Sequence, residues 1–483
     1  MRKTKIICTI GPTSEREEIL EEMILSGMDI ARINTSHSDR AEVITLVKRI
    51  RKISKRTGKN TAIILDLQGP KIRIGELSRS ILLKSGQDII FYTGKTNKNK
   101  KSGRELMIQV GYSRFIDDIR KGVTIFIDDG LIECKVLKID EENKSALCSV
   151  ITGGTLSSHK GINLPGVSVS IKSITEKDLE FLKLGLELEV DFIAQSFVRS
   201  KADIRTIRNI INKAGSPVRI ISKIEKHEAV KAFEEILEVS DAIMIARGDL
   251  GIEIDAEFVP VVQKRIIKRS NLEGKPVITA TQMLNSMIEN PRPTRAEVSD
   301  VANAILDGSD AVMLSGETAA GSYPLKSLDM MVRVIIETEK TLDYGLISQN
   351  NAILRKKLDI PHNTTTEAIS YASCEIAAIL DADAIISSTE SGATARQVSK
   401  NRPGCMIIGT SPNQYVVRQL MLSWGVIPLK TVTSKNIDSM IEEDIKVSLE
   451  TGYIQKGSRV IITAGVMVNE PGSTNLINVR EVK

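Results

Sequence analysis

The sequence predicts a (β/α)8 barrel of the TIM type that carries two further domains. Eight strand-sized apolar runs alternate with amphipathic helical patterns, which is typical of parallel strands closed into a barrel. A stretch of alternating strands and turn pairs interrupts this series after the third run, and a second βα series follows the eighth. The predicted domains are residues 1–69 with 168–345 for the barrel, 70–167 for an all-β lid and 346–483 for a C-terminal open α/β domain.

Length and composition bound the class of protein. The chain has 483 residues, more than one hydrophobic core usually serves, and its 41% hydrophobic and 26% charged residues are ordinary for a globular protein. Its apolar runs are too short to span a bilayer, so we expect no membrane partner. Five scattered cysteines without a C-x-x-C motif favour reduced thiols and a cytoplasmic location.

The charge pattern gives no sign of nucleic-acid binding. The net charge is only +5, and the one basic cluster, residues 94–104, lacks interleaved aromatic residues in a chain that is 3% aromatic. We interpret this cluster as a solvated loop and expect no nucleic-acid partner.

The barrel strands are predicted from eight apolar runs. In chain order these are residues 4–10, 29–34, 61–67, 191–197, 219–225, 242–248, 276–282 and 311–317. Amphipathic segments such as residues 15–27 and 228–240 separate them, with apolar residues at helical spacing. The chain therefore supplies eight βα units, the number that closes a barrel.

The interruption after the third run is predicted to be a lid. Residues 70–167 read as β-strands separated by turns, and the pairs Asp129-Gly130 and Gly153-Gly154 are hairpin signals. A separate lobe carried by a barrel loop is in a position to cover the barrel rim. The C-terminal part, from about residue 346, alternates helices with short apolar runs such as 384–389 and 459–465, which favours an open α/β domain.

Polar residues end nearly every predicted barrel strand. Because the carboxyl ends of parallel strands share one rim, we expect these side chains to converge there. They are Arg32, Asn34, Ser36, Asp66, Arg73, Ser196, Lys223, Glu225, Arg247, Gly248, Asp249, Thr279, Thr281, Ser315 and Glu317. A single polar strand end is usually a cap or a solvated turn, but seven strand ends on one rim favour a catalytic site.

The chemistry of these residues points to a metal and an anionic substrate. Glu225 and Asp249 offer two carboxylates from adjacent strands, which suits a hard divalent ion such as Mg²⁺. The cations Arg32, Arg73 and Lys223 outnumber these acids and favour a phosphorylated substrate. The alternative use of Lys223 is a Schiff base, but an acid two residues away would keep that lysine protonated.

Four segments resemble the pyruvate kinase family. These are "RINTSHS" (32–38), "IISKIEKHEAV" (220–230), "ARGDLGIEI" (246–254) and the run from "ATQMLNSMIENPRPTRAEVSD" to "SGETA" (280–319). The resemblance extends over the whole chain, including the lid and the C-terminal domain. It implies phosphoryl transfer from phosphoenolpyruvate to ADP with Mg²⁺ or Mn²⁺, giving pyruvate and ATP in the last step of glycolysis, by a homotetramer.

The resemblance also implies a role for each matching residue. Lys223 would neutralise the phosphoryl group and then the enolate oxygen. Thr281 would serve protonation of the enolate carbon. The implied metal ligands are Glu225 and Asp249. The implied substrate-binding residues are Lys223, Gly248, Asp249, Thr281, Arg73 and Ser196. The implied nucleotide-binding residues are Asn34, His37 and Arg32, and Arg32 is also counted as catalytic. A second Mg²⁺ would arrive with the nucleotide.

One departure concerns the monovalent-cation site of the family, which implies Asn34, Ser36, Asp66 and Leu67 here. Members that need potassium read Asp-Thr-Lys-Gly-Pro-Glu after the third strand, whereas this chain reads "DLQGPK" with Lys71 in place of the glutamate. A potassium ion about 5 Å from that ammonium would meet roughly 3 kcal/mol of repulsion at an effective dielectric near 20. We therefore expect Lys71 to replace K⁺; the alternative is that Lys71 points to solvent.

A second departure concerns regulation. Residues 387–396, "SSTESGATAR", form a strand–loop–helix junction that suits a phosphate, and related loops in the family bind sugar-phosphate effectors. Glu390 stands where members that respond to fructose 1,6-bisphosphate often carry lysine. We expect a monophosphate effector (AMP or a sugar monophosphate) or none, and the alternative is a capped helix without a ligand. The candidate effector residues are Ser388, Thr389, Ser391 and Thr394.

Two other functions remain open at this point. A carbon–carbon lyase of the wider phosphoenolpyruvate/pyruvate barrel group would share the metal and enolate chemistry, but it would not need the lid or three cations. A binding protein on an inactive barrel would be expected to lack one of Lys223, Glu225, Asp249 or Thr281, and all four are present.

Overall fold

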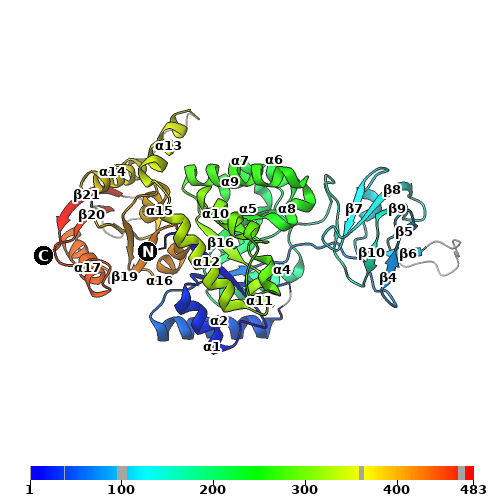
Figure 1. The fold of residues 1–483 in the computed structure, drawn as a ribbon, viewed down its shortest axis with the longest axis horizontal. Helices are drawn as coiled ribbons and strands as arrows, with labels where there is room; N and C mark the ends of the chain where they lie inside the picture. Colours follow the sequence, from blue (N-terminus) through cyan, green and yellow to red (C-terminus); the bar gives the residue numbers. More distant parts are fainter. Residues whose placement is uncertain (1, 37, 95–105, 358–363, 466–473) are drawn as a thin grey trace.

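The computed structural model describes residues 1–483 except 1, 37, 95–105, 358–363 and 466–473. Figure 1 shows three bodies in a row: the lid at one end, the barrel in the middle and the C-terminal domain at the other end. The predicted fold class is confirmed; the residue limits given for the three domains stay predictions. Among the described residues, no helix combines the length and apolar character needed to cross a bilayer.

Eight parallel strands close the central barrel. The strands are β1 Lys5–Ile10, β2 Ile30–Asn34, β3 Ala62–Asp66, β12 Phe192–Gln195, β13 Arg219–Ile224, β14 Ala242–Ala246, β15 Val277–Ala280 and β16 Ala311–Leu314. They pair in chain order, and β16 returns to pair with β1. The strand β12 pairs directly with β3 although more than a hundred residues separate them in the chain, so the barrel sheet continues past the lid.

Helices surround this barrel and are started by local sequence signals. They are α1 Glu17–Ser26, α2 Arg40–Thr57, α4 Glu176–Glu187, α5 Lys201–Lys213, α6 His227–Lys231, α7 Phe233–Val239, α8 Arg247–Glu253, α9 Val259–Glu273, α10 Arg295–Leu306, α11 Gly316–Ala319 and α12 Pro324–Glu339, with 3₁₀ turns at Ala256–Phe258 and Asn285–Ile288. Capping boxes begin α2 at Asp39, α4 at Thr175 and α10 at Thr294. One apolar cluster fills the barrel interior, and a larger one lies between strands and helices.

The lid is an independent β domain with its own apolar core. Its elements are β4 Ile81–Leu83, β5 Asp88–Tyr92, β6 Leu106–Gln109, α3 Phe115–Asp118, β7 Thr124–Ile127, β8 Ile132–Asp140, β9 Ser145–Thr152, β10 Gly154–Leu156 and β11 Ile162–Asn163. The Asp129-Gly130 turn joins β7 to β8, as predicted, with both residues at positive φ. The Gly153-Gly154 hairpin prediction is wrong, because β10 pairs with β4 instead of β9.

Both connections of the lid to the barrel meet at one side chain. The outgoing chain turns at Gly69, whose φ of 68° favours glycine, and the Gly69 N–H donates to Asp178 Oδ1 at 3.2 Å. The returning chain ends at Thr175, whose N–H and hydroxyl donate to Asp178 Oδ2 at 2.9 and 2.7 Å. Asp178 is 1% exposed, so a single buried carboxylate anchors both ends of the lid.

The C-terminal domain is an open five-stranded sheet. Its elements are α13 Tyr344–Lys357, α14 Thr365–Ile379, β17 Ala384–Ser388, α15 Ala393–Lys400, β18 Met406–Ser411, α16 Gln414–Gln419, a 3₁₀ turn at Leu420–Leu422, β19 Val426–Lys430, α17 Ile437–Glu450, β20 Arg459–Gly465 and β21 Thr474–Glu481. The strand order is β19-β18-β17-β20-β21, and only β21, which the sequence analysis does not place, runs antiparallel.

Ion pairs join this domain to the amino-terminal ends of the barrel strands. Asp191 Oδ1, on a residue with no exposed surface, accepts from Arg418 Nε at 2.6 Å. Arg402 Nη2 pairs with Asp310 Oδ1 at 3.0 Å. The C-terminal domain therefore lies at the end of the barrel opposite to the lid, which leaves the carboxyl rim free for the site described next (Figure 1).

Candidate active site

A cavity of about 460 Å³ lies between the carboxyl rim of the barrel and the lid. The barrel contributes the ends of β2, β3, β12 and β13 and the helix α8, while the lid contributes residues 128–129 and 159–164. Of the predicted site residues, the cavity is lined by Arg32, Asn34, Ser36, Asp66, Leu67, Lys71, Arg73, Ser196, Lys223, Glu225 and Asp249. The structure thus brings together side chains that are far apart in the sequence.

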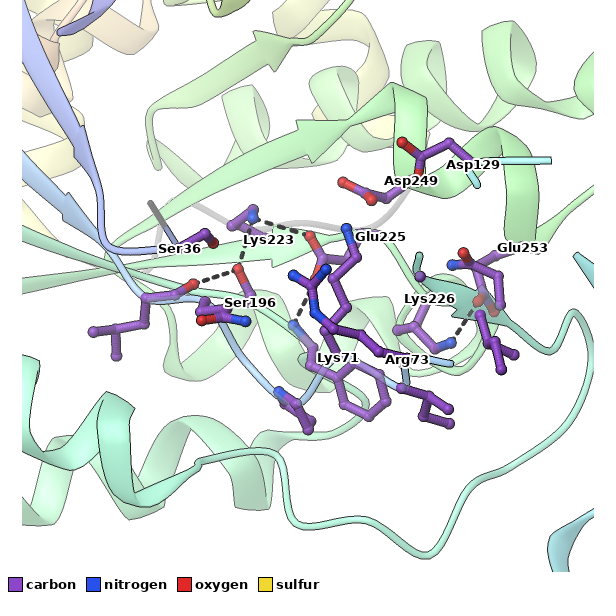
Figure 2. A pocket seen from close by; sticks show the side chains of 18 of the residues that line it. Ser36, Lys71, Arg73, Asp129, Ser196, Lys223, Glu225, Lys226, Asp249 and Glu253 are labelled. Atoms are coloured by element: carbon purple, nitrogen blue, oxygen red, sulfur yellow. Dashed lines mark hydrogen bonds and ion pairs between the residues drawn. The ribbon is translucent and has the colours of Figure 1, made fainter. Parts of the chain in front are cut away.

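Lys223 lies at the centre of this group. Its Nζ donates to Ser196 Oγ at 2.6 Å and lies 3.1 Å from Glu225 Oε2 and 3.5 Å from Asp66 Oδ1. Ser196 Oγ in turn donates to the carbonyl oxygen of Leu67 at 2.7 Å. Figure 2 shows Ser36, Ser196 and Lys223 on one side of the cavity, Lys226 and Glu253 on the other, and Glu225 between them.

The charges of this cluster hold Lys223 in its ammonium form. Burial lowers the pKa of Lys223, but the carboxylates of Asp66, Glu225 and Asp249 outweigh it and raise that pKa above its usual range. Burial raises the pKa of Asp66, but Lys223 and Arg32 outweigh it and the net shift is downward. A lysine held in this way can stabilise negative charge, and it is unsuited to Schiff-base formation.

Glu225 and Asp249 offer the oxygen ligands that Mg²⁺ or Mn²⁺ requires. Glu225 Oε1 accepts from the Phe197 N–H at 2.7 Å, while Glu225 Oε2 is buried without a hydrogen bond. Burial and the neighbouring Asp249 raise the pKa of Glu225 in spite of Lys223. Lys223 Nζ is the ion-pair partner of that oxygen, and a cation between the two carboxylates would add a second partner and relieve their repulsion, so these residues fit a divalent metal.

Thr281 joins the site through the first turn of α8. Its Oγ1 accepts from the Gly248 N–H at 2.8 Å, next to Asp249. A Cβ on Gly248 would lie 3.5 Å from Thr281 Oγ1, which is ordinary van der Waals contact, so the hydrogen bond and not the absence of a side chain defines this approach. Neither Gly248 nor Thr281 lines the described cavity; both lie directly behind Asp249.

The predicted cationic and amide residues Arg32, Asn34 and Arg73 line the same cavity. Arg32 is buried, and its Nε pairs with Asp66 Oδ2 at 2.7 Å while its Nη1 donates to Thr9 Oγ1 at 2.9 Å. Asn34 Oδ1 accepts from the Ser36 N–H at 3.2 Å. Arg73 Nη1 donates to the carbonyl oxygen of His159 at 2.9 Å, which holds Arg73 on the lid side of the cavity.

Lys71 lies at the hinge side of the same cavity. Lys71 is exposed and is one of the residues that line the cavity. Its Cε packs against Gly161 of the lid so closely that a Cβ added at Gly161 would lie only 3.0 Å from it. A residue at this place can send its ammonium group either into the cavity or to solvent. Replacement of potassium by Lys71 therefore stays a prediction.

Several lining residues are absent from the sequence-based predictions. Lys226 Nζ lies 2.5 Å from Glu253 Oε1 and 4.9 Å from the centre of the Phe197 ring, and Lys160 Nζ lies 2.8 Å from Asp128 Oδ1. Lys226 lies two residues beyond the end of β13, where strand alternation no longer indicates a face. Asp128 directly precedes the predicted turn pair Asp129-Gly130, and the two adjacent acids are a signal that could have indicated a charged side of the lid.

Two groups of predicted residues lie elsewhere. His37 lies outside the described residues. The candidate effector residues lie in the C-terminal domain, where the Thr389 N–H donates to the Thr410 carbonyl at 2.9 Å and the Thr394 and Thr474 hydroxyls lie 2.6 Å apart. The Ser391 carbonyl accepts from Arg219 Nη2 at 3.0 Å, and Ser388 ends β17. Their role as an effector site stays a prediction.

Comparisons with known proteins agree with this geometry. A family model for the barrel domain of pyruvate kinase matches residues 1–328, and one for its alpha/beta domain matches residues 367–480. The chain is 45% identical to a pyruvate kinase of Sporosarcina psychrophila over 484 residues and 44% identical to one of Staphylococcus aureus over 483 residues, covering 100% of this chain and 81% of each relative.

A solved structure is similar throughout. A pyruvate kinase from Cryptosporidium parvum superposes with a TM-score of 0.91 at 38% identity, and the match covers 100% of this chain and 96% of that one. Models of both domains, relatives that match over the whole of this chain and a superposable structure together show that the chain belongs to the pyruvate kinase family.

Proposed function

We propose that this protein transfers the phosphoryl group of phosphoenolpyruvate to ADP and protonates the resulting enolate, giving pyruvate and ATP. The observation that carries the proposal is the position of Lys223: its Nζ lies among Ser196, Asp66 and Glu225 in a cavity that also holds Asp249. A buried ammonium beside two potential metal ligands matches the charge that develops when a phosphoryl group leaves an enolate.

In the first step, the phosphoryl group moves from the enol oxygen to the nucleotide. Lys223 neutralises the phosphoryl oxygens during transfer and then the enolate oxygen that is left. Arg73, on the lid side of the cavity, and Arg32, on the barrel side, hold phosphates. Glu225 and Asp249 would hold Mg²⁺ or Mn²⁺, which would supply Lewis-acid stabilisation of the negative charge on the substrate.

In the second step, a proton reaches the enolate carbon. By resemblance to the family, the Gly248 and Asp249 N–H groups would orient the substrate carboxylate, with the Gly248 N–H leaving Thr281 Oγ1 to do so, and Thr281 would lie on the face of proton delivery. The contact between Thr281 Oγ1 and the Gly248 N–H supports this placement, because it ties the hydroxyl to the segment that would bind substrate. The family resemblance assigns nucleotide binding to Asn34, Arg32 and His37, of which Asn34 and Arg32 line the cavity.

The reaction is proposed to need no potassium. Lys71 at the cavity would supply the positive charge that K⁺ supplies in members with a glutamate at this position. Asn34, Ser36, Asp66 and the Leu67 carbonyl would then surround an ammonium instead of a metal ion. Assay in tetramethylammonium salts, with and without added KCl, tests this, and strong activation by KCl would contradict it.

We further propose a homotetramer in the cytoplasm, as in the family, and a C-terminal loop that binds a sugar monophosphate, AMP or no effector. Glu390 in that loop disfavours a doubly phosphorylated ligand. Tight activation by fructose 1,6-bisphosphate would show that this charge argument is wrong. Sedimentation of the purified chain measures the oligomeric state.

A coupled assay for pyruvate tests the main proposal. Pyruvate should form from phosphoenolpyruvate only when both ADP and Mg²⁺ are present. Pyruvate formation without ADP would instead indicate a phosphatase or lyase reaction on the same barrel. No turnover with any nucleoside diphosphate would favour a binding protein.

A further inference from the structure

The backbone that presents Thr281 has an unusual conformation. Thr281 and Gln282, directly after β15, have φ angles of 68° and 54°, in the left-handed region. A β-branched residue such as threonine rarely adopts this region, because its side chain crowds the backbone there. Two consecutive non-glycine residues in this conformation require contacts that hold them in place.

The side chain of Arg247 supplies those contacts. Its Nη2 lies 3.0 Å from the Thr281 carbonyl oxygen, 3.4 Å from the Gln282 carbonyl oxygen and 2.9 Å from Met283 Sδ. The left-handed turn points two successive carbonyl groups in one direction, and a single guanidinium nitrogen meets both of them. Arg247 therefore stabilises the left-handed conformation of Thr281 and Gln282.

Asp300, on α10, fixes Arg247 in turn. Its two carboxylate oxygens lie 2.8 Å from Arg247 Nη1 and 2.7 Å from Arg247 Nη2, which is the bidentate geometry of a strong arginine–carboxylate pair. Gln263 Oε1 accepts a longer hydrogen bond from Nη1 at 3.4 Å. The Arg247 side chain is only 10% exposed, so the guanidinium is largely shielded from water, whereas Asp300 is 39% exposed.

These contacts converge on one hydroxyl. Arg247 directly precedes Gly248, whose N–H donates to Thr281 Oγ1 at 2.8 Å, and Thr281 Oγ1 donates to the Ala280 carbonyl at 2.6 Å. The start of α8 and the turn after β15 are thus linked twice, by the Arg247 side chain to the Thr281 backbone and by the Gly248 backbone to the Thr281 side chain.

We propose that Arg247 and Asp300 are positioning residues that hold Thr281 for proton delivery to the enolate. This inference rests on the proposed function and adds two residues to it. Arg247 does not line the described cavity, so it acts through Thr281 rather than on the substrate. A purely structural ion pair would affect stability and substrate binding, whereas this pair affects the protonation step that depends on Thr281.

The test is a double-mutant cycle with R247Q and T281A. In the wild-type background, R247Q should lower kcat by roughly 10- to 100-fold, while KM for phosphoenolpyruvate changes by less than about threefold. In the T281A background the same substitution should lower kcat by less than about twofold, because the group that it positions is gone. Equal factors in both backgrounds would overturn the proposal.

A second readout isolates the protonation step. The methyl protons of pyruvate exchange with D₂O when the enzyme forms the enolate in reverse, and NMR follows this exchange in the presence of Mg²⁺ and ATP. R247Q should slow the exchange at least as much as it slows overall turnover. Exchange at the wild-type rate in the folded variant would contradict the role given to Arg247.

Three further variants complete the design. D300N removes the partner of Arg247 at a side chain that is 39% exposed, so it carries the test if R247Q fails to fold. It should show the same fall in kcat, and an unchanged kcat in folded D300N would overturn the proposal. R247K should not restore activity, because an ammonium cannot pair with Asp300 in a bidentate manner and also meet two carbonyl groups.

The matched control is R333Q, which breaks an exposed pair with Asp329 at 3.0 Å on α12 and should leave kcat unchanged. Thermal melting of each variant confirms folding. If the wild-type protein makes no pyruvate, the proposed function fails; if the wild type is active and the cycle is additive, only the positioning proposal fails.

Discussion

Lys223 Nζ lies 3.1 Å from Glu225 Oε2 at the carboxyl end of β13. Residues two apart on a strand share a face, so the ammonium and the carboxylate enter the same cavity from one element. Asp249 raises the pKa of both groups from across the cavity. A substrate that brings negative charge and a metal that brings positive charge would each find its partner here. Three predictions concern this cavity, and a fourth concerns Asp444 on α17 of the C-terminal domain.

Removing the ammonium should abolish turnover without unfolding the protein. K223M leaves the developing enolate charge without its neighbour, so we expect kcat to fall by about a thousandfold or more. Steady-state assay of pyruvate formation measures the effect. K231M, at an exposed lysine on α6, is the control and should retain wild-type activity. Activity within tenfold of wild type in K223M would contradict the role of Lys223.

Removing one carboxylate should weaken metal binding. E225Q or D249N should raise the apparent Kd of Mn²⁺, measured by water proton relaxation, by roughly a hundredfold, because a divalent ion loses one of two charged ligands. Chelation of the metal with EDTA should abolish turnover of the wild type. E257Q, at an exposed acid shortly after α8, is the control and should bind Mn²⁺ normally. Normal Mn²⁺ affinity in both site variants would place the metal elsewhere.

Reversing the charge at Lys71 should create a need for potassium. K71E replaces the ammonium with a carboxylate near Asn34 and Ser36, which line the same cavity. We expect K71E to be nearly inactive in tetramethylammonium chloride and to be activated at least tenfold by KCl, whereas the wild type should respond little. The control is K177E, at an exposed lysine on α4. Equal responses of K71E and wild type to KCl would favour a Lys71 that points to solvent.

The stability of the C-terminal domain should depend on pH through Asp444. Burial raises the pKa of Asp444 from 3.8 to about 7, although the Thr410 and Ser388 hydroxyls oppose the shift. The folded state therefore binds a proton that the unfolded state releases, and stability falls as the pH rises from about 4 to 7. The full shift corresponds to about 4 kcal/mol as an upper bound.

D444N keeps the shape of this side chain and removes its titration. The variant should melt at a higher temperature than the wild type at pH 8, and the difference should shrink toward pH 5. E442Q, at an exposed acid on the same helix, serves as the control and should follow the wild-type slope. Parallel melting curves for wild type and D444N across this range would show that Asp444 does not titrate there.

Local patterns predicted the barrel because each of its strands is buried and bounded by helical segments. The same rule located Lys223 and Glu225, since charges inside an apolar strand require a partner or a ligand. The strand-end rule listed Gly248 and Thr281 among many residues, and only the motif resemblance gave them roles: the left-handed turn that brings them together depends on Arg247 and Asp300, which are distant in the chain.

The misses have equally physical reasons. A glycine pair usually indicates a tight turn. Gly153 instead allows its backbone to lie close to that of Leu83, because a Cβ at Gly153 would collide with the Leu83 carbonyl oxygen. The pairing of Lys226 with Glu253 depends on the length of α8, which ends only at Glu253. The strand β21 lies at a sheet edge and is half exposed, so its residues carry a weak apolar pattern.

Asp178 has a mechanical consequence. Because it binds the Gly69 N–H on the outgoing chain and Thr175 on the returning chain, both connections of the lid to the barrel are anchored at the same side chain. Such an attachment permits rotation about a single axis and resists translation, which would break buried hydrogen bonds. We expect the lid to rotate as a rigid body about the Asp178 anchor. Such a rotation would move Lys160 and Asp128 together across the open end of the barrel.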